Sequence, residues 1–307
     1  MKVSGYTTTY NCIDMDYPVD LCIESLLSFC DEVCVADGGS TDGTTELIRS
    51  KFPEVAIKSF PIDFSNTRWA IQADGKLKHN ARKMCSGDIL WHADNDEIVD
   101  NRQYKEARRV CEIFGNTGLH KVGIVNFKEF WGGLNKLRAD VKTRPAVSLK
   151  SAGFNIGIPY YAERIDEDGN KFCAPFKSDS CQYINNQGMI AEFAQLTNTP
   201  LKVWHLSWLD FKRKIKHYKE FWHKFHASMY DLKLDDTAEN NVMFNKSWKE
   251  VGDKDIDDMC EKLSQYGPRS FHTKQNKWTG AVEYVDKKQI PENIIKWAED
   301  RKIFYED

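Results

Sequence analysis

The chain has 307 residues, enough for one large domain or two ordinary ones, and its 41% hydrophobic and 29% charged residues exclude a disordered protein. The net charge of −3 excludes a protein that binds nucleic acid over its whole surface. The sequence has no run of 18 apolar residues and no apolar signal-peptide core at its start, so we expect no transmembrane segment and a cytoplasmic location. Nine scattered cysteines without a Cys-x-x-Cys pair indicate reduced, buried thiols.

Strands and helices alternate over the first hundred residues. In chain order, the apolar patterns predict a strand at 3–10, a helix at 18–29, a strand at 32–36, a helix at 44–52, a strand at 55–60, a helix at 67–85 and a strand at 89–91. This alternation predicts an α/β fold with a mainly parallel sheet flanked by helices. Ligands of such sheets lie at the carboxyl ends of the strands.

The order of elements changes after residue 120. Strands are expected at 122–130 and 144–150, residues 151–200 are rich in loop-forming residues, and the chain becomes helical from Leu209. No compositional shift marks a linker. We therefore expect a first domain at 1–208 and a mainly helical extension at 209–307 that packs on it.

An acidic cluster, Asp94-Asn95-Asp96-Glu97, directly follows the buried strand at 89–91. Carboxylates at the end of a buried strand are costly unless a positive charge neutralises them. Mg²⁺ often takes this role and bridges carboxylates to the phosphates of a substrate. The alternative is a solvated acidic loop.

A second polar segment follows the strand at 32–36. Asp37 closes that strand, Gly38 and Gly39 permit a tight turn, and Ser40 or Thr41 can cap the next helix. A carboxylate at this position can accept hydrogen bonds from a nucleobase or a ribose. An ordinary strand-to-helix turn is the alternative.

Three segments together resemble the family 2 glycosyltransferases in order and spacing. They are Thr8-Thr9-Tyr10-Asn11, the run from Val35 to Thr44, and Ser86-Gly87-Asp88 leading into Asp94-Asn95-Asp96-Glu97. The likeness covers roughly residues 1–135. It implies the GT-A fold, a nucleotide-sugar donor, with a UDP-sugar expected, and a Mn²⁺ or Mg²⁺ ion at the Asp-x-Asp motif. One departure is Gly38, where the family usually has a second acidic residue after Asp37.

The resemblance also implies roles for individual residues. Those implied to bind the nucleotide are Thr8, Tyr10, Asn11, Asp37, Arg82, Asp94 and Asn95. Those implied to bind the metal ion are Asp96, Asp94 and His205, although a histidine on an apolar strand is also a common core residue. Basic residues between the third strand and the acidic cluster could support the leaving diphosphate: Arg68, Lys76, Lys78 and Arg82.

Members of this family invert the anomeric centre, which requires a general base near the acceptor hydroxyl. Asp179 and Glu129 are the preferred candidates, with Glu163 and Glu192 as alternatives, and any of them could be a surface carboxylate. Trp131 could form a platform on which a sugar stacks, or belong to the core.

The segment 211–226 is both basic and aromatic. It contains six basic residues and one acidic residue. Its residues at helical spacing predict a buried face, and they are Phe211, Ile215, Tyr218, Trp222 and Phe225. The basic residues would then form the opposite face, either solvated or bound to a phosphate-bearing partner. Such a partner would be a nucleic-acid backbone or anionic lipid headgroups at a membrane surface.

The resemblance implies a metal-dependent, inverting glycosyltransferase that transfers a sugar from a nucleotide-diphosphate donor to a hydroxyl acceptor. The expected acceptor is a glycan or a lipid-linked sugar. One alternative is transfer to a hydroxylated base in DNA. Another, from a different class, is a non-catalytic module that binds sugar nucleotides or glycans. A dinucleotide-binding enzyme is disfavoured because no Gly-x-Gly-x-x-Gly follows the first strand.

Overall fold

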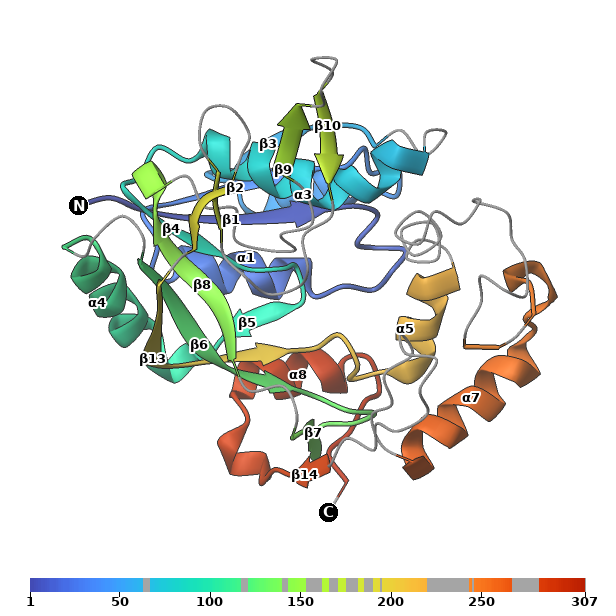
Figure 1. The fold of residues 1–307 in the computed structure, drawn as a ribbon. Helices are drawn as coiled ribbons and strands as arrows, with labels where there is room; N and C mark the ends of the chain where they lie inside the picture. The colour runs from blue at the N-terminus through green and yellow to red at the C-terminus, as the bar shows by residue number, and fades with distance from the viewer. Residues whose placement is uncertain are drawn as a thin grey trace. The chain divides into compact units, whose positions relative to one another are not determined.

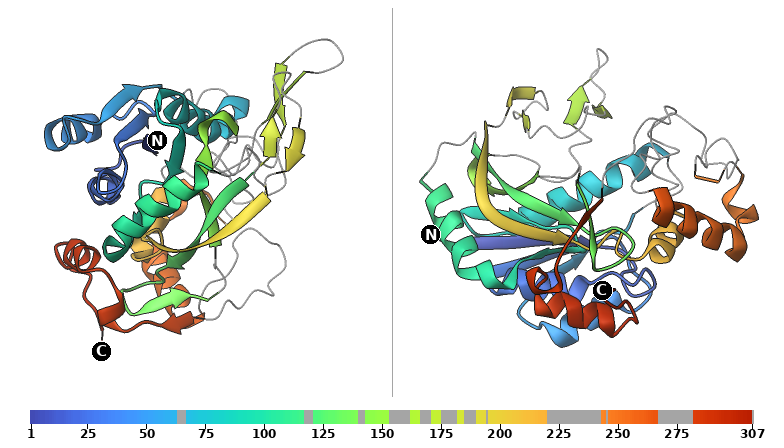
Figure 2. Two further views of the ribbon diagram at one scale, coloured as in Figure 1. Left: turned by 90° about the vertical axis from the view of Figure 1, so that its left-hand side faces the viewer. Right: turned by 90° about the horizontal axis from the view of Figure 1, so that it is seen from below.

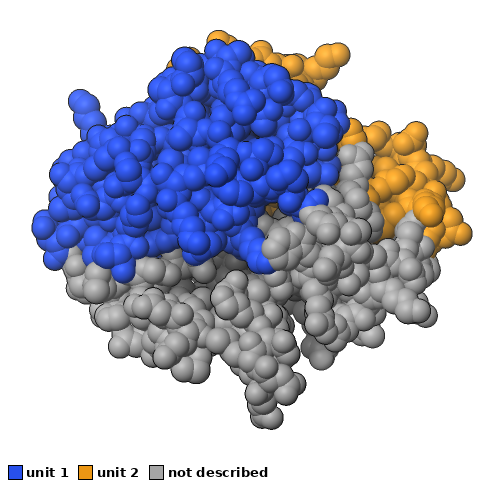
Figure 3. All heavy atoms as spheres, turned by 90° about the horizontal axis from the view of Figure 1, so that it is seen from above, with its two compact units in different colours: residues 1–63, 72–126, 143–203 blue, residues 64–71, 127–142, 204–307 orange. Residues whose placement is uncertain are grey.

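A computed structural model describes most of the chain. The residues it describes are 1–62, 67–116, 121–139, 143–152, 162–165, 171–174, 182–184, 190–193, 195–219, 243–244, 246–266 and 282–306. The chain divides into two compact units, coloured in Figure 3. Unit 1 comprises 1–63, 72–126 and 143–203, and unit 2 comprises 64–71, 127–142 and 204–307. Unit 2 therefore includes residues 64–71, 127–142 and 204–208 from the part of the chain that the sequence assigned to the first domain.

The predicted alternation of strands and helices in unit 1 is confirmed. In chain order the elements are β1 (Val3–Thr9), α1 (Val19–Leu27), β2 (Glu32–Asp37), α2 (Thr44–Lys51), β3 (Ala56–Ser59), α3 (Thr67–Met84) and β4 (Ile89–His92). Every residue of β1 is buried. A strand covered on both faces in this way is typical of the centre of a parallel sheet.

Eight strands form one mixed sheet in the order β3-β2-β1-β4-β8-β6-β13-β5 (Figure 1). The strands not yet given are β5 (Glu97–Val99), β6 (Lys121–Glu129), β8 (Thr143–Leu149) and β13 (Gln195–His205). β1 pairs in parallel with both β2 and β4, while β8 runs antiparallel to β4 and β6. β13 is a long curved strand beside β6 (Figure 2). The predicted α/β class is confirmed.

Helices cover both faces of this sheet. A side chain at Gly5 would contact Leu26 of α1, whereas the next residue, Tyr6, belongs to a buried cluster with Leu77 of α3. Successive residues of a strand face opposite sides, so α1 and α3 lie on opposite faces. A further helix, α4 (Tyr104–Phe114), packs on β4 and β8 and was not predicted.

Residues 151–200, which the sequence predicted to be rich in loops, contain strands that were not predicted. These are β9 (Ala162–Ile165), β10 (Lys171–Ala174), β11 (Gln182–Ile184) and β12 (Ile190–Phe193), and the first half of β13. β9 pairs with β10, and β11 pairs with β12, each antiparallel. Strands of three or four residues are too short to show an alternating pattern above the background of polar and glycine residues.

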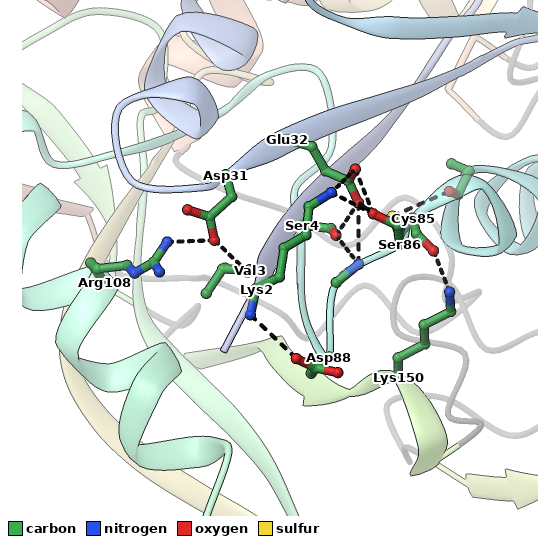
Figure 4. A network of polar contacts seen from close by, with 12 residues as sticks. Lys2, Val3, Ser4, Asp31, Glu32, Cys85, Ser86, Asp88, Arg108 and Lys150 are labelled. Atoms are coloured by element: carbon green, nitrogen blue, oxygen red, sulfur yellow. Dashed lines mark hydrogen bonds and ion pairs between the residues drawn. The ribbon is translucent and has the colours of Figure 1, made fainter.

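The amino ends of the strands in unit 1 are joined by a polar network around Glu32 (Figure 4). The Glu32 carboxylate accepts hydrogen bonds from Lys2 Nζ at 2.8 Å, from Ser4 Oγ at 2.5 Å and from the backbone amides of Ser86 and Gly87 at 2.5 and 3.2 Å. These donors come from β1 and from the turn before β4. The network therefore fixes three neighbouring segments at the edge opposite to the strands' carboxyl ends.

Unit 2 contains three helices of seven or more residues among its described residues: α5 (Phe211–His217), α7 (Asp253–Tyr266) and α8 (Glu292–Glu299). A two-stranded ladder pairs β7 (Lys136–Arg138) with β14 (Val282–Tyr284). The buried face predicted for the segment 211–226 is confirmed for Phe211 and Ile215, which are 8% and 0% exposed. In the described parts of the chain, no helix has both the length and the apolar character needed to span a bilayer.

Trp131 is a core residue of unit 2. It is 2% exposed, its indole N–H donates to the Leu263 carbonyl at 3.2 Å, and its ring packs against Trp208 and Phe211 at centroid distances of 5.0 Å. Next to it, Gly132 has φ of +66° and lies under the Phe211 ring. A buried ring with its polar atom satisfied is not available to stack on a sugar, so the core interpretation of Trp131 is the correct one.

Candidate functional site

Three polar segments meet at the carboxyl ends of β1, β2 and β4. Because β1 lies between β2 and β4, the residues after each strand are neighbours in space. Thr9, the last residue of β1, donates its hydroxyl to Asp37, the last residue of β2, at 2.9 Å. On the other side, the Asn95 amide group lies 3.4 Å from the Thr8 carbonyl. The polar residues that follow these three strands are therefore neighbours, whereas Ser86 and Gly87 of the third motif segment lie at the opposite edge of the sheet.

Asp37 organises the turn between β2 and α2. It is 1% exposed and accepts four hydrogen bonds: from the hydroxyls of Thr9 and Ser40 at 2.9 and 2.5 Å, and from the amides of Gly39 and Ser40 at 2.9 Å each. Four donors match the lone pairs of a carboxylate. The alternative interpretation, a strand-to-helix turn, thus describes what Asp37 does here, and its contact with a base or ribose stays a prediction.

The capping residue predicted for α2 was wrong. Neither Ser40 nor Thr41 caps the helix, which instead begins after Gly43 at φ of +91°, without a side-chain cap. The Asp42 carboxylate accepts from the Thr44 amide at 3.0 Å. Gly43 adopts a left-handed conformation that turns the chain after Asp42. Ser40 and Thr41 therefore lie before the helix and form hydrogen bonds within the loops.

The loop after β1 is bonded to this turn along its whole length. Asn11 has a φ of +45°. Its backbone N–H donates to Ser40 Oγ at 2.9 Å, and its side-chain Oδ1 accepts from the Thr41 backbone N–H at 2.8 Å. Asp42 accepts from the amides of Ile13 and Asp14 at 2.9 Å each. Partial burial raises the Asp42 pKa, but these hydrogen bonds outweigh it and the net pKa is lowered. The loop is thus held in place around an ionised carboxylate.

Tyr10 stands beside this turn. Its ring lies 3.2 Å from the position that a side chain at Gly38 would occupy, and its side chain is half-buried. Burial, and then the charges of Asp37 and Asp42, raise the pKa of its hydroxyl. Gly38 therefore allows the Tyr10 ring to approach the turn closely.

The acidic cluster is a folded turn rather than a solvated loop. Asp96 and Glu97 are 5% and 3% exposed, and Glu97 accepts from the Asp94 amide at 2.9 Å, which closes the turn. Asp94 pairs with Lys78 Nζ of α3 at 2.9 Å, and Nε2 of His92 lies 3.5 Å from the same oxygen. Lys78 is 5% exposed. The positive charge that the sequence required beside Asp94 is therefore present as a buried lysine.

Arg82 has a different environment from the one expected for a nucleotide-binding residue. Its guanidinium donates to Ser148 Oγ at 3.2 Å and to the carbonyls of Leu149 and Lys150 at 3.0 and 3.1 Å. It is 6% exposed and ties α3 to the end of β8. Lys78, one helical turn earlier, reaches the acidic turn and pairs with Asp94.

A second buried polar cluster lies in unit 2. Glu129, 4% exposed, has Oε1 2.8 Å from Nδ1 of His205 and Oε2 2.8 Å from Nη1 of Arg138. Burial raises the Glu129 pKa, but the bond to His205 and the neighbouring positive charges outweigh it, so the net pKa is lowered. A carboxylate with a lowered pKa and both oxygens bound is a weak general base.

The other base candidates are not described at the level of side chains. Asp179 lies outside the described residues, and Glu163 and Glu192 lie in β9 and β12, whose side chains are likewise not described. Asp179 therefore stays the preferred prediction for the general base.

The metal site expected from the sequence is not assembled by the side chains that the structure describes. Among these, no group of three or more His, Cys, Asp or Glu residues is arranged to hold a metal ion. Asp94 is paired with Lys78, and His205 with Glu129. The ligand set of Asp94, Asp96 and His205 stays a prediction.

The basic face predicted for the segment 211–226 is only partly present in its described part, 211–219, where Lys212 and Lys216 are exposed but two other basic residues are buried. Arg213 and Lys214 are each 9% exposed and donate back to the turn before α5, to the Leu206 carbonyl and the Ser207 hydroxyl. Lys212 pairs with Asp257 at 2.8 Å, and Lys219 donates to the Val251 carbonyl at 3.1 Å. Long basic side chains can fold along a helix onto carbonyl groups, which sequence spacing does not reveal.

No family model and no curated protein matches the sequence. Among solved structures, S. aureus TarS 1-349 is 12% identical, with 87% of this chain and 92% of that chain covered and a TM-score of 0.38. This chain spans only 50% of a second TarS structure. The mannosyltransferase PcManGT from Pyrobaculum calidifontis, in complex with GDP-Man and Mn²⁺, is 20% identical over 42% of this chain and 36% of that one, with a TM-score of 0.30.

A third similar structure is glucosyl-3-phosphoglycerate synthase from Mycobacterium tuberculosis, in complex with phosphoglyceric acid. It is 19% identical over 42% of this chain and 44% of that one, with a TM-score of 0.27. All three scores lie below 0.5, so these likenesses do not by themselves establish a common fold or activity.

Proposed function

We propose that this protein is a glycosyltransferase of the GT-A type that transfers a sugar from a nucleotide-diphosphate donor, with UDP as the expected nucleotide, to a hydroxyl acceptor. The observation that supports the proposal most strongly is the meeting of three polar segments at the carboxyl ends of β1, β2 and β4. Ligands of parallel α/β sheets bind at this edge. Asp37, Asp94 and Asp96 are all present, which argues against a non-catalytic module.

In this proposal the loops after β1 and β2 hold the nucleoside. Tyr10 offers an aromatic ring beside the turn that Asp37 fixes, and Asn11 locks the two loops together. Because these groups are already bonded to one another, little conformational entropy is lost when a nucleotide binds.

Lys78 is the residue we propose to balance the charge at the diphosphate. Glycosyl transfer separates a diphosphate from the sugar, and a fixed positive charge stabilises the negative charge that develops. Lys78 is buried and already oriented by Asp94. Mn²⁺ or Mg²⁺, expected from the motif, would add to this stabilisation electrostatically without supplying a proton. Asp179 is proposed as the base that takes the proton of the acceptor hydroxyl, with inversion at the sugar.

The acceptor is proposed to be a glycan or lipid-linked sugar. The alternative acceptor, a hydroxylated base in DNA, depended on a basic face in the segment 211–226. Arg213 and Lys214 are turned inward in its described part, so no observation favours this alternative.

The test is donor binding by thermal shift with UDP-, GDP-, TDP- and CDP-sugars, each with and without Mn²⁺. We expect one donor to raise the melting temperature, and Lys78→Met and Asp96→Ala to abolish the shift. Lys83→Met, an exposed lysine of the same helix, is the matched control. Release of the nucleoside diphosphate in the presence of acceptor glycans then measures transfer. Absence of a shift with every donor, with and without metal, would contradict the proposal.

A further inference from the structure

Two cysteines that are far apart in the sequence meet in the core of unit 1. Cys34 belongs to β2, and Cys85 is the residue directly after the end of α3. Both are free thiols, both are 1% exposed, and both belong to the same buried cluster. Their side chains are hydrogen-bonded to each other. The fold therefore places two reduced thiols in direct contact.

The surroundings hold both thiols in this position. Cys34 pairs in register with Tyr6 of β1 and with Ala56 of β3, so its backbone is fixed within the sheet. Cys85 Sγ lies 3.4 Å from the Ala81 carbonyl in the last turn of α3. A disulfide forms without backbone rearrangement only where two cysteines lie close together with their side chains directed toward each other. The contact between the two thiols meets this requirement.

The pair lies beneath the polar network at the amino ends of the strands. Cys34 is two residues from Glu32 and therefore on the same side of β2. Cys85 precedes Ser86, whose amide donates to the Glu32 carboxylate at 2.5 Å (Figure 4). Ser86 is exposed, and the Glu32 side chain is 23% exposed. Exposed hydrogen bonds open locally at a small cost in free energy, so a molecule as small as hydrogen peroxide can reach the thiols.

Cys34 is the more reactive thiol of the pair. The hydrogen bond with Cys85 lowers the pKa of Cys34 and outweighs the opposing effect of burial, whereas the same bond raises the pKa of Cys85. Burial raises the pKa of Cys12 and of Cys111 to about 12. Because the thiolate is the form that reacts with oxidants, oxidation is expected at Cys34 before Cys12 or Cys111.

We infer that Cys34 and Cys85 form a site of oxidative modification, at which hydrogen peroxide converts the two thiols into a reversible disulfide that fastens the end of α3 to β2. The Cys34 thiolate attacks one peroxide oxygen, the O–O bond breaks, and hydroxide leaves a sulfenic acid on Cys34. Cys85 then gives its proton to hydroxide and attacks the Cys34 sulfur, which expels the sulfenic oxygen as hydroxide. In total, the thiols lose two electrons and two protons, and one peroxide becomes two water molecules.

The inference is independent of the proposed function, although α3 is also the helix whose Lys78 pairs with Asp94. The test treats the full chain with hydrogen peroxide, blocks the remaining thiols with iodoacetamide, and identifies linked peptides by mass spectrometry without reduction. We expect one peptide pair joined through Cys34 and Cys85, which dithiothreitol separates again. Titration of thiols in denaturant should fall by two from the nine of the untreated chain.

Three variants identify the reacting thiols, and thermal melting confirms that each is folded. In Cys85→Ala, we expect a sulfenic acid at Cys34 that dimedone traps and no disulfide. In Cys34→Ala, we expect thiols to be lost about tenfold more slowly than in the wild type, because the thiol with the lowered pKa is absent. Cys260→Ala, which removes a partly buried thiol of unit 2, is the control and should form the disulfide at the wild-type rate.

The absence of a peptide linked through Cys34 and Cys85 at every peroxide concentration would overturn the inference. Oxidation of Cys34 to a sulfinic acid without linkage would also overturn it, because the second thiol would then be out of reach. Equal rates of thiol loss in the wild type and in Cys34→Ala would show that other cysteines react first, and the inference would be wrong. The peptide map of the wild type decides the question even if a variant does not fold.

Discussion

The polar network around Glu32 predicts a specific loss of stability for Glu32→Gln. The network lowers the Glu32 pKa from 4.5 to about 2: burial opposes this shift, and the hydrogen bonds from Lys2, Ser4 and Ser86 outweigh it. At about 1.4 kcal/mol per pKa unit, the difference sets a ceiling of about 3.5 kcal/mol for the contribution of the charged form. Lys2 is 45% exposed and Glu32 23%, so solvent screening reduces the expected value to about 1–2 kcal/mol.

The sign of the pH dependence follows from the direction of the shift. Because the folded protein holds Glu32 at a lower pKa than the unfolded chain, the stabilisation is fully present above pH 4.5 and is lost as the pH falls toward about 2. Urea unfolding of the wild type and Glu32→Gln, at a series of pH values from neutral down to the acid limit of the folded state, measures the difference directly.

The difference between the two proteins is expected to be largest at neutral pH and to shrink below pH 4.5. Glu54→Gln, which removes an exposed carboxylate, is the control and should change the free energy of unfolding by less than about 0.5 kcal/mol. A Glu32→Gln effect that is absent at neutral pH, or that is independent of pH, would refute the account of this network.

Three further substitutions test the packing and the turn. Gly132→Ala places a methyl group 2.4 Å from the Phe211 ring, at a residue whose φ is positive. Urea unfolding should therefore show that the free energy of unfolding falls by about 2 kcal/mol or more. Gly252→Ala, whose methyl group would have no neighbouring atom closer than 3.9 Å, is its control. Arg82→Met removes three hydrogen bonds to Ser148, Leu149 and Lys150, at the end of β8, and should lower the free energy of unfolding by about 2–3 kcal/mol. A decrease below about 0.5 kcal/mol would contradict the view that Arg82 ties α3 to β8. Asp37→Asn turns an amide donor toward backbone N–H groups and should cost about 1–3 kcal/mol by thermal melting; an unchanged melting temperature would show that the turn does not depend on Asp37.

Local patterns determined the secondary structure of the first 92 residues. The apolar runs and helical faces of residues 1–92 predicted β1 to β4 and α1 to α3, because each pattern is set by neighbours within one element. The same patterns identified Phe211 and Ile215 as buried. The strands of 151–200 were missed because three or four residues do not display a period, and the pairing that stabilises them comes from another segment.

Some features of the candidate site were likewise predictable from local sequence, and others were not. The sequence by itself determined that an acidic turn follows a buried strand and that Asp37 closes a neighbouring strand, since both depend only on adjacent residues. Only the tertiary structure decided which charges meet. Lys78 rather than Arg82 reaches Asp94, Glu129 binds His205 and Arg138, and Arg213 and Lys214 fold inward. Ion pairs and hydrogen bonds form between side chains that are distant in the sequence, and their partners are set by how strands and helices pack, which no local period encodes.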